Sequence, residues 1–206
     1  MFKAEIKKIL DVYYKEYKNI FNVFGFSSDR FTEENQTVNF CRAVQKICED
    51  ALVWYEYPWV NDEVKNERKS NSRFDAVIYL PKEKALIVVE AKCLRHKGKY
   101  EAMYNDLERI IEENNKVIIN NNKIKTIYAV ILADFWNGKR KNSQYYNLQN
   151  YWKKDVDTNG FKQDENEWFN KFVELTAELE SPDWNCKGNL IDNKNYHLLS
   201  VIGKVK

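Results

Sequence analysis

The segment that decides the fold is Arg73-Phe-Asp-Ala-Val-Ile-Tyr-Leu-Pro-Lys-Glu-Lys-Ala-Leu-Ile-Val-Val-Glu-Ala-Lys92. Residues 74–80 and 85–91 are rich in Val, Ile, Leu and Tyr, and the four residues between them are polar and begin with proline. This pattern predicts two antiparallel strands joined by a tight turn. Strict alternation puts Phe74 on the same face as Ala76, and Val77 on the other. Both faces are apolar, which is typical of central strands covered on both sides.

The length of the turn also predicts which residues face each other across the hairpin. If Leu80 pairs with Ala85, Asp75 lies opposite Glu90, and directly opposed residues have Cβ atoms about 5 Å apart. Lys92 lies on the same face as Glu90 because side chains alternate along a strand. Two carboxylates this close repel each other, and Mg²⁺ between them would relieve the repulsion. The alternative is a structural ion pair in which Lys92 neutralises one of the acids.

The order Asp75, then Glu90-Ala91-Lys92 at the end of the next apolar strand, resembles the PD-(D/E)xK nuclease superfamily. This superfamily includes many type II restriction endonucleases and Holliday-junction resolvases. The resemblance is one of pattern over about residues 32–134, and Phe74 stands where the family name has proline. It implies an α/β fold of the restriction-endonuclease-like kind, a mixed β-sheet flanked by helices on both faces.

The resemblance also implies roles for the clustered residues. Asp75 and Glu90 would hold Mg²⁺, with Mn²⁺ as a substitute, and the carbonyl of Ala91 would be a further oxygen ligand. Lys92 would position the attacking water and neutralise charge on the phosphate. The metal would lower the pKa of that water.

A further acid is expected from a helix that precedes the sheet in the resembled family. The segment Thr32-Glu-Glu34-Asn-Gln-Thr37 is similar to that element, and the role is assigned to Glu34, with Glu33 as its substitute. The alternative is that these acids only favour the N-terminus of a helix, where the dipole attracts negative charge.

The rest of the chain reads as a single domain, residues 1–206, with its core at about 32–134. We treat the N-terminal helix 3–24 and the C-terminal region 144–203 as elaborations of that core. A strand at 126–133 should run parallel to 85–91 through a right-handed crossover. The remaining elements are expected as helices at 32–50, 100–114, 144–155 and 164–180 and as strands at 52–59 and 196–202.

Basic side chains near the predicted strand ends are candidates for contacts with a phosphate backbone. The alternative is that they form solvated loops. The candidates are Arg73, Arg95, Lys97, Lys99, Lys139 and Arg140.

Composition limits the class of protein. Hydrophobic residues make up 44% of the 206 residues, which excludes a disordered chain and suffices for one substantial core. The net charge of +2 neither requires nor excludes a nucleic-acid partner. The four cysteines are scattered, which does not fit a structural zinc site. We expect no signal peptide, no membrane span and a cytoplasmic location.

The sequence therefore predicts a Mg²⁺-dependent DNA endonuclease of restriction type. A nuclease this small that cuts both strands commonly works as a homodimer, with one active site per strand. Two alternatives stay open at this point. One is a nuclease acting on branched DNA or RNA, and the other is a nucleic-acid-binding module that has kept the fold without catalysis.

Overall fold

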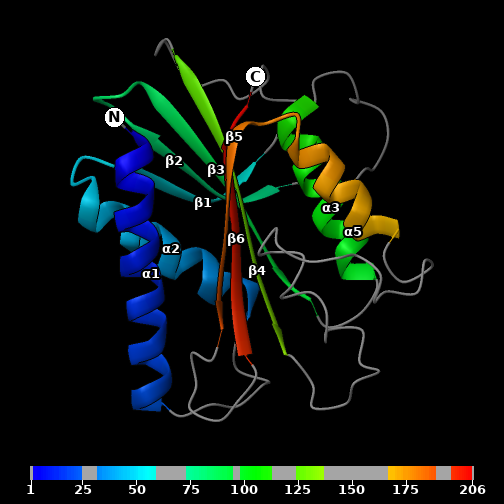
Figure 1. Ribbon diagram of the computed structural model, residues 1–206. Coiled ribbons are helices and arrows are strands. Elements are labelled where there is room, and N and C mark those ends of the chain that lie inside the picture. Colours follow the sequence, from blue (N-terminus) through cyan, green and yellow to red (C-terminus); the bar gives the residue numbers. More distant parts are fainter. Residues whose placement is uncertain are drawn as a thin grey trace.

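The structure is a computed structural model that describes residues 2–24, 32–58, 73–94, 98–112, 124–136, 167–188 and 196–205. It contains helices on both sides of a sheet (Figure 1). The helices are α1 (Phe2–Phe24), α2 (Glu33–Ile47), α3 (Gly98–Glu112) and α5 (Glu167–Thr176). The strands are β1 (Leu52–Pro58), β2 (Arg73–Leu80), β3 (Ala85–Cys93), β4 (Thr126–Trp136), β5 (Glu180–Gly188) and β6 (Tyr196–Lys204).

All six strands form one mixed sheet in the order β1-β2-β3-β4-β6-β5. Strands β3 and β4 are parallel, as the strand–helix–strand order predicted, and the other neighbours are antiparallel. The fold class α/β with a mixed sheet is therefore confirmed. Strand β6 lies inside the sheet between β4 and β5, so this part of the C-terminal region belongs to the sheet itself.

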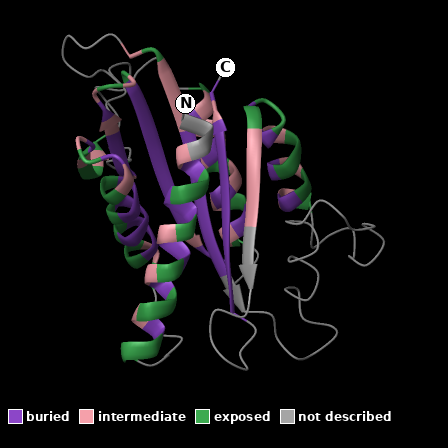
Figure 2. Ribbon diagram, turned by 60° about the vertical axis from the view of Figure 1, so that its left-hand side comes forward, coloured by how far each residue is buried: buried purple, intermediate pink, exposed green. Residues whose placement is uncertain are grey.

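Two apolar cores lie on the two faces of the sheet, and each is covered by a pair of helices (Figure 2). Helices α1 and α2 cover one face, where Tyr13 and Tyr17 of α1 are completely buried. Helices α3 and α5 cover the other face, where Leu107 and Phe172 are completely buried. The expectation of helices on both faces is confirmed.

Phe74 packs on the face opposite to the one expected. It belongs to the α3 and α5 core together with Val77, whereas Ala76 belongs to the α1 and α2 core. The regular alternation of strand β2 thus breaks between Phe74 and Ala76. The pairing of β1 with β2 is also irregular here. Tyr55 pairs with Ala76 and Tyr57 pairs with Phe74, whereas Glu56 between them has a positive φ of 51°.

The local signals for α2 act as expected at its start. The Thr32 side chain accepts a hydrogen bond from the backbone N–H of Asn35, so it caps the first turn. Apolar periodicity predicts that Val38 lies on the buried face of this helix, but the residue is 39% exposed. It lies on the exposed face of α2 with Arg42 and Gln45, while Phe40 and Val44 are buried.

The expectations for the C-terminal part are partly wrong. Helix α5 ends at Thr176, and an unexpected strand, β5, begins at Glu180. The helix proposed at 144–155 lies outside the described residues. None of the helices in the described ranges has the length and apolar character needed to cross a lipid bilayer.

Candidate functional site

Strands β2 and β3 separate at the end where the acidic residues lie. The register is the predicted one from Leu80 opposite Ala85 to Ala76 opposite Val89. The paired residues end there, so the predicted direct pairing of Asp75 with Glu90 is not part of the ladder. Beyond that point the backbone N–H groups of β3 are satisfied by carboxylates instead of by β2. Ala91 N donates to Asp75 Oδ2 at 2.7 Å. The side chain of Asp75 thus takes the place of a ladder hydrogen bond.

Glu33 satisfies the next β3 N–H on the same side of the strand, two residues after Ala91, in the same way. Cys93 N donates to Glu33 Oε1 at 3.0 Å, and Lys99 Nζ lies 2.7 Å from the same oxygen. Glu33 is the first residue of α2, so the N-terminus of that helix is fastened to the end of β3. Two carboxylates therefore line the point where the hairpin opens.

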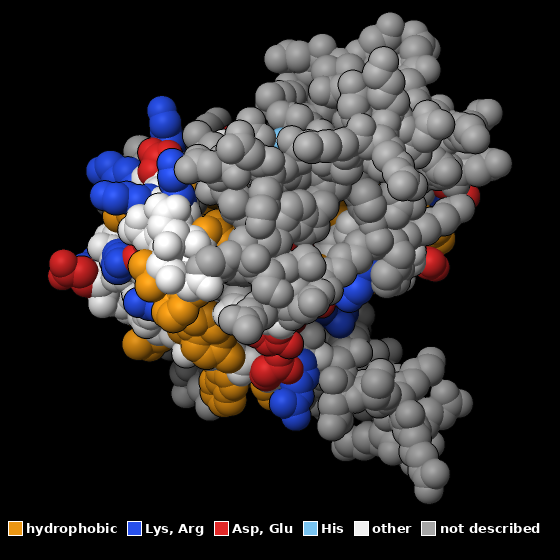
Figure 3. Space-filling model, turned by 90° about the horizontal axis from the view of Figure 1, so that it is seen from below, with side chains coloured by type: hydrophobic (Ala, Val, Ile, Leu, Met, Phe, Trp, Pro, Cys, Tyr) orange, Lys and Arg blue, Asp and Glu red, His pale blue; other side chains and the backbone are white. Residues whose placement is uncertain are grey.

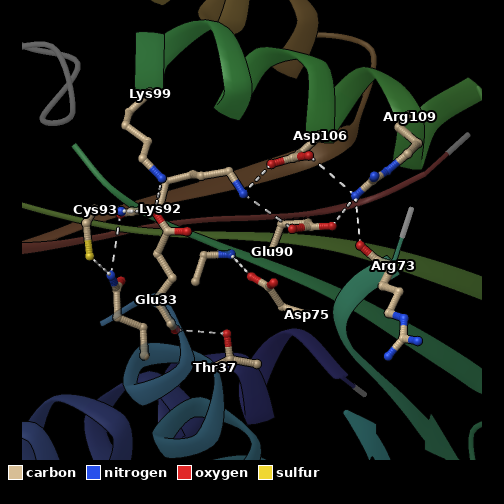
Figure 4. Close-up of polar contacts among 12 residues, drawn as sticks. Glu33, Thr37, Arg73, Asp75, Glu90, Lys92, Cys93, Lys99, Asp106 and Arg109 are labelled. Carbon is tan, nitrogen blue, oxygen red and sulfur yellow. Dashed lines mark hydrogen bonds and ion pairs between the residues drawn. The ribbon is translucent and has the colours of Figure 1, made fainter. Parts of the chain in front are cut away.

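A buried ionic cluster lies on the α3 side of the same strand end (Figure 4). Glu90 is 2% exposed, and its two oxygens face two cations. Glu90 Oε2 lies 3.5 Å from Lys92 Nζ, and Glu90 Oε1 accepts a hydrogen bond from Arg109 Nη2. Asp106 bridges these cations, with Oδ2 2.5 Å from Lys92 Nζ and Oδ1 3.4 Å from Arg109 Nη2.

The cluster holds more negative than positive charge. Glu90 and Asp106 contact two cations, Lys92 and Arg109, and the nearby carboxylate of Asp75 adds a third negative charge that acts on Glu90. Burial raises the pKa of Glu90 well above its usual value, and the charges of Asp106 and Asp75 raise it further, against Lys92 and Arg109. Burial alone would lower the pKa of Lys92, but Asp106 and Glu90 raise it above its usual value.

The two pKa directions have different main causes. An isolated ion pair lowers the pKa of its acid while raising that of its base. Here burial is the largest cause of the raised pKa of Glu90, and nearby acids add to it, whereas nearby acids raise the pKa of Lys92 against the effect of burial. Burial likewise raises the pKa of Asp75, against the hydrogen bond from Ala91 and the charge of Lys92. A bound proton or a further cation near Asp75 and Glu90 would therefore relieve the cost of ionising these acids.

The structure corrects the choice of the helix acid. Glu34 is exposed, and the pKa of its carboxyl is lowered first by a hydrogen bond with Thr32. Glu33 is the acid that reaches β3. Successive residues of a helix point about 100° apart, so only one of the two acids can face the strand end. The acid of α2 that lies at this strand end is therefore Glu33, the substitute for Glu34 in the prediction.

The basic candidates are placed only in part. Lys99 is half-buried and paired with Glu33. The backbone carbonyl of Arg73 accepts a hydrogen bond from Arg109 Nη2 at 3.4 Å. The guanidinium of Arg73 points away from the cluster (Figure 4). Four candidates lie outside the described residues: Arg95, Lys97, Lys139 and Arg140. Figure 3 views the molecule from below, and acidic and basic side chains lie beside each other in the part of this face that is coloured.

Three polar residues of the site were not predicted. Asp106 and Arg109 are one turn apart on α3, beside its apolar stripe, and this i, i+3 pair of opposite charges was the available signal. Gln36 is fully buried, and its Nε2 donates to the carbonyl of Lys92 at 3.4 Å and to Asp134 Oδ1 at 3.2 Å. Gln36 thereby fixes the end of β3 against α2.

The oxygen donors present fit a small hard cation. Within the described ranges, no three His, Cys, Asp or Glu side chains are grouped as a metal site. Asp75 and Glu90 nevertheless supply two carboxylates. In an antiparallel pair, the N–H and C=O of one residue face the same neighbour, so the Ala91 carbonyl faces the side of Asp75. Two carboxylates, a carbonyl and several waters are a set that Mg²⁺ accepts.

Comparison with known proteins gives no family assignment. No family model matches the chain, and no match is found among curated proteins or among solved structures.

Proposed function

We propose that this protein is a Mg²⁺-dependent phosphodiesterase, and specifically an endodeoxyribonuclease of restriction type. The observation that carries the proposal is the buried group of Asp75, Glu90 and Lys92 at the open end of the β2–β3 hairpin, with acidic charge in excess. A structural ion pair has no need of a second acid close by whose burial raises its pKa. A divalent cation would supply the charge that the group lacks.

Each residue of the group has a part in the proposed chemistry. Asp75, Glu90 and the Ala91 carbonyl would hold the cation, and Mn²⁺ would be accepted in its place. The bound cation would lower the pKa of a water and stabilise charge on the reacting phosphate. Lys92, held by Asp106 at 2.5 Å, would orient that water and neutralise the phosphate. Glu33, on the neighbouring strand N–H, would direct further bound water.

DNA is the proposed substrate because of the basic residues around the strand ends. Arg73 is exposed at the start of β2, and Lys99 lies in the first turn of α3 beside Glu33. Phosphate contacts of this kind position a duplex without reading its sequence. The restriction-endonuclease-like form of the α/β fold, a homodimer with one site per strand and a cytoplasmic location belong to the same proposal.

The experiment that tests the proposal is cleavage of supercoiled plasmid in Mg²⁺, in Mn²⁺ and in EDTA. The expected result is metal-dependent nicking or linearisation by the wild-type protein and none in EDTA. Asp75→Asn and Lys92→Met should each reduce the rate by at least about a thousandfold, since they remove parts that act as a unit. Lys171→Gln, on the exposed side of α5, is the control and should cleave normally.

Two results would contradict the proposal. Cleavage that persists unchanged in Asp75→Asn would place the chemistry elsewhere. A folded wild-type protein that binds plasmid in every metal without cutting it would instead support a binding module. The same assay with competing RNA and with branched DNA would separate those substrates from duplex DNA.

A further inference from the structure

Both oxygens of the Glu90 carboxylate are already engaged by cations of the chain. Oε1 accepts from Arg109 Nη2, and Oε2 lies 3.5 Å from Lys92 Nζ. Glu90 is also among the least exposed polar residues of the described part of the chain. A metal ion that uses Glu90 as a ligand must therefore displace one of these two contacts.

Lys92 makes the weaker of the two contacts, and its ammonium serves the proposed reaction from where it stands. Its nearer partner is Asp106, at 2.5 Å, and not Glu90. Lys92 can thus keep its place while the Glu90 carboxylate turns toward a metal. Its contact with Glu90 is a weak obstacle.

Arg109 is the stronger obstacle to metal binding. Its Nη2 donates directly to Glu90 Oε1, on the carboxylate that would face the metal. It also has three other anchors, namely Asp106 Oδ1 at 3.4 Å, the Arg73 carbonyl at 3.4 Å and the Phe74 ring, whose centroid lies 4.7 Å from its guanidinium carbon. These anchors hold the guanidinium at the site whether or not it contacts Glu90.

We propose that Arg109 is a built-in competitor of the metal ion: in the metal-free protein its guanidinium occupies Glu90 Oε1, and the metal must displace it. This inference rests on the proposed function, because it takes Glu90 as a metal ligand. The protein then binds metal weakly by itself. A displaced guanidinium remains beside the site through its other anchors, where its N–H groups suit a phosphate oxygen.

The role of Arg109 follows from charge and position together. Without its guanidinium, Glu90 and Asp106 keep only Lys92 as a cation of the cluster, with the charge of Asp75 nearby, so the attraction for a divalent cation increases. The contribution to catalysis has the opposite sign, because the residue that would meet the phosphate is lost. If the arginine were merely structural, replacing it would weaken both metal binding and cleavage.

The test is titration with Mn²⁺ alone at pH 8, with free Mn²⁺ followed by electron paramagnetic resonance. Arg109→Gln should lower the Kd for Mn²⁺ by about tenfold, within the usual range for coupled sites. Arg109→Met, which keeps an unbranched side chain against Phe74, should do the same and serves if Arg109→Gln does not fold. Lys171→Gln removes one positive charge from α5, outside the cluster, and should leave the Kd unchanged. Circular dichroism establishes that each variant is folded.

The outcomes separate this inference from the proposed function. Wild-type affinity that is lost in Asp75→Asn and is unchanged or weaker in both Arg109 variants would overturn the inference and leave the metal site intact. Absence of Mn²⁺ binding in every variant, or binding that ignores Asp75→Asn, would overturn the proposed function itself. Plasmid cleavage at saturating Mn²⁺ is the second measurement. The cleavage rate should fall at least about tenfold in Arg109→Gln, although the lower Kd means that Mn²⁺ binds more tightly. A structural role does not produce weaker cleavage together with tighter metal binding.

Discussion

The backbone N–H of Ala91 donates a 2.7 Å hydrogen bond to the carboxylate of Asp75, where a neighbouring strand would otherwise supply the acceptor. The carboxylate is therefore fixed by the backbone at the point where the hairpin opens. It is also poorly solvated, and this burial raises its pKa. Holding the ionised carboxylate of Asp75 in this buried position costs stability, and it gives the carboxylate a defined position.

Replacing Asp75 by Asn should stabilise the metal-free protein at neutral pH. The folded pKa of Asp75 is raised above its unfolded value, so the cost of ionising it is present above the folded pKa and is lost as pH falls through the unfolded pKa. Asn keeps an oxygen for the Ala91 N–H and carries no charge. The expected gain is about 1 kcal/mol at pH 7, measured by thermal and urea unfolding in EDTA, and it should vanish near pH 3.

Asp50→Asn is the control for that experiment, because Asp50 makes a surface pair with Lys82 at 3.4 Å. Its effect should lie within about half a kcal/mol at both pH values. A loss of stability at pH 7 in Asp75→Asn would mean that the carboxylate is there for structural reasons.

Glu33 and Glu34 should differ sharply in plasmid cleavage. Glu33→Gln removes a charge that acts on Asp75 and breaks the pair with Lys99, and cleavage should fall about tenfold or more, as for other residues that orient a metal site. Glu34→Gln alters an exposed carboxylate and should stay within about twofold of wild type. Equal losses in the two variants would contradict the assignment of Glu33.

Gly203 of β6 should tolerate no side chain, because a Cβ there would lie 2.7 Å from the Cβ of the buried residue Leu179. Gly203→Ala should cost about 1–3 kcal/mol in urea unfolding, since the crowding forces backbone or side-chain shifts. Gly98→Ala, at the exposed start of α3, is the matched control and should be neutral or slightly stabilising. A neutral Gly203→Ala would show that β6 and Leu179 separate easily.

Cys41 should be inert to thiol reagents in the folded protein. Burial raises the pKa of its thiol to about 12, so little reactive thiolate exists at pH 8. Alkylation of Cys41, followed by mass spectrometry of peptides, should be at least about a hundredfold slower in the native protein than in urea. Labelling of native Cys41 at the rate of a free thiol would mean that α2 opens readily from the sheet.

The parts of the fold that the sequence predicted are those set by local pattern. The turn Pro81–Lys84 fixes the hairpin register, which brings Asp75 and Glu90 to one strand end. Continuous apolar runs separated by an amphipathic helix predicted the parallel pairing of β3 with β4. These features depend on periods of two and 3.6 residues, which can be read directly from the chain.

The parts that escaped prediction depend on how elements pack against each other. Whether Glu33 or Glu34 faces β3 is decided by the rotation of α2 about its axis, which sequence spacing does not define. Arg109 joins the site only because α3 packs across β3. Strand β5 contains Pro182 and a register shift and lacks apolar alternation, so its sequence does not predict a strand. It forms at the edge of the sheet because it pairs with β6.

The metal site is tested most directly by anomalous scattering from crystals soaked in Mn²⁺. We predict one strong anomalous peak between the carboxylates of Asp75 and Glu90, within about 2.3 Å of an oxygen of each, with the Arg109 guanidinium moved off Glu90. If the protein cleaves DNA but the peak lies elsewhere, the proposed metal site is wrong. Cleavage with no peak at this position and with Arg109 still bound to Glu90 would also contradict it.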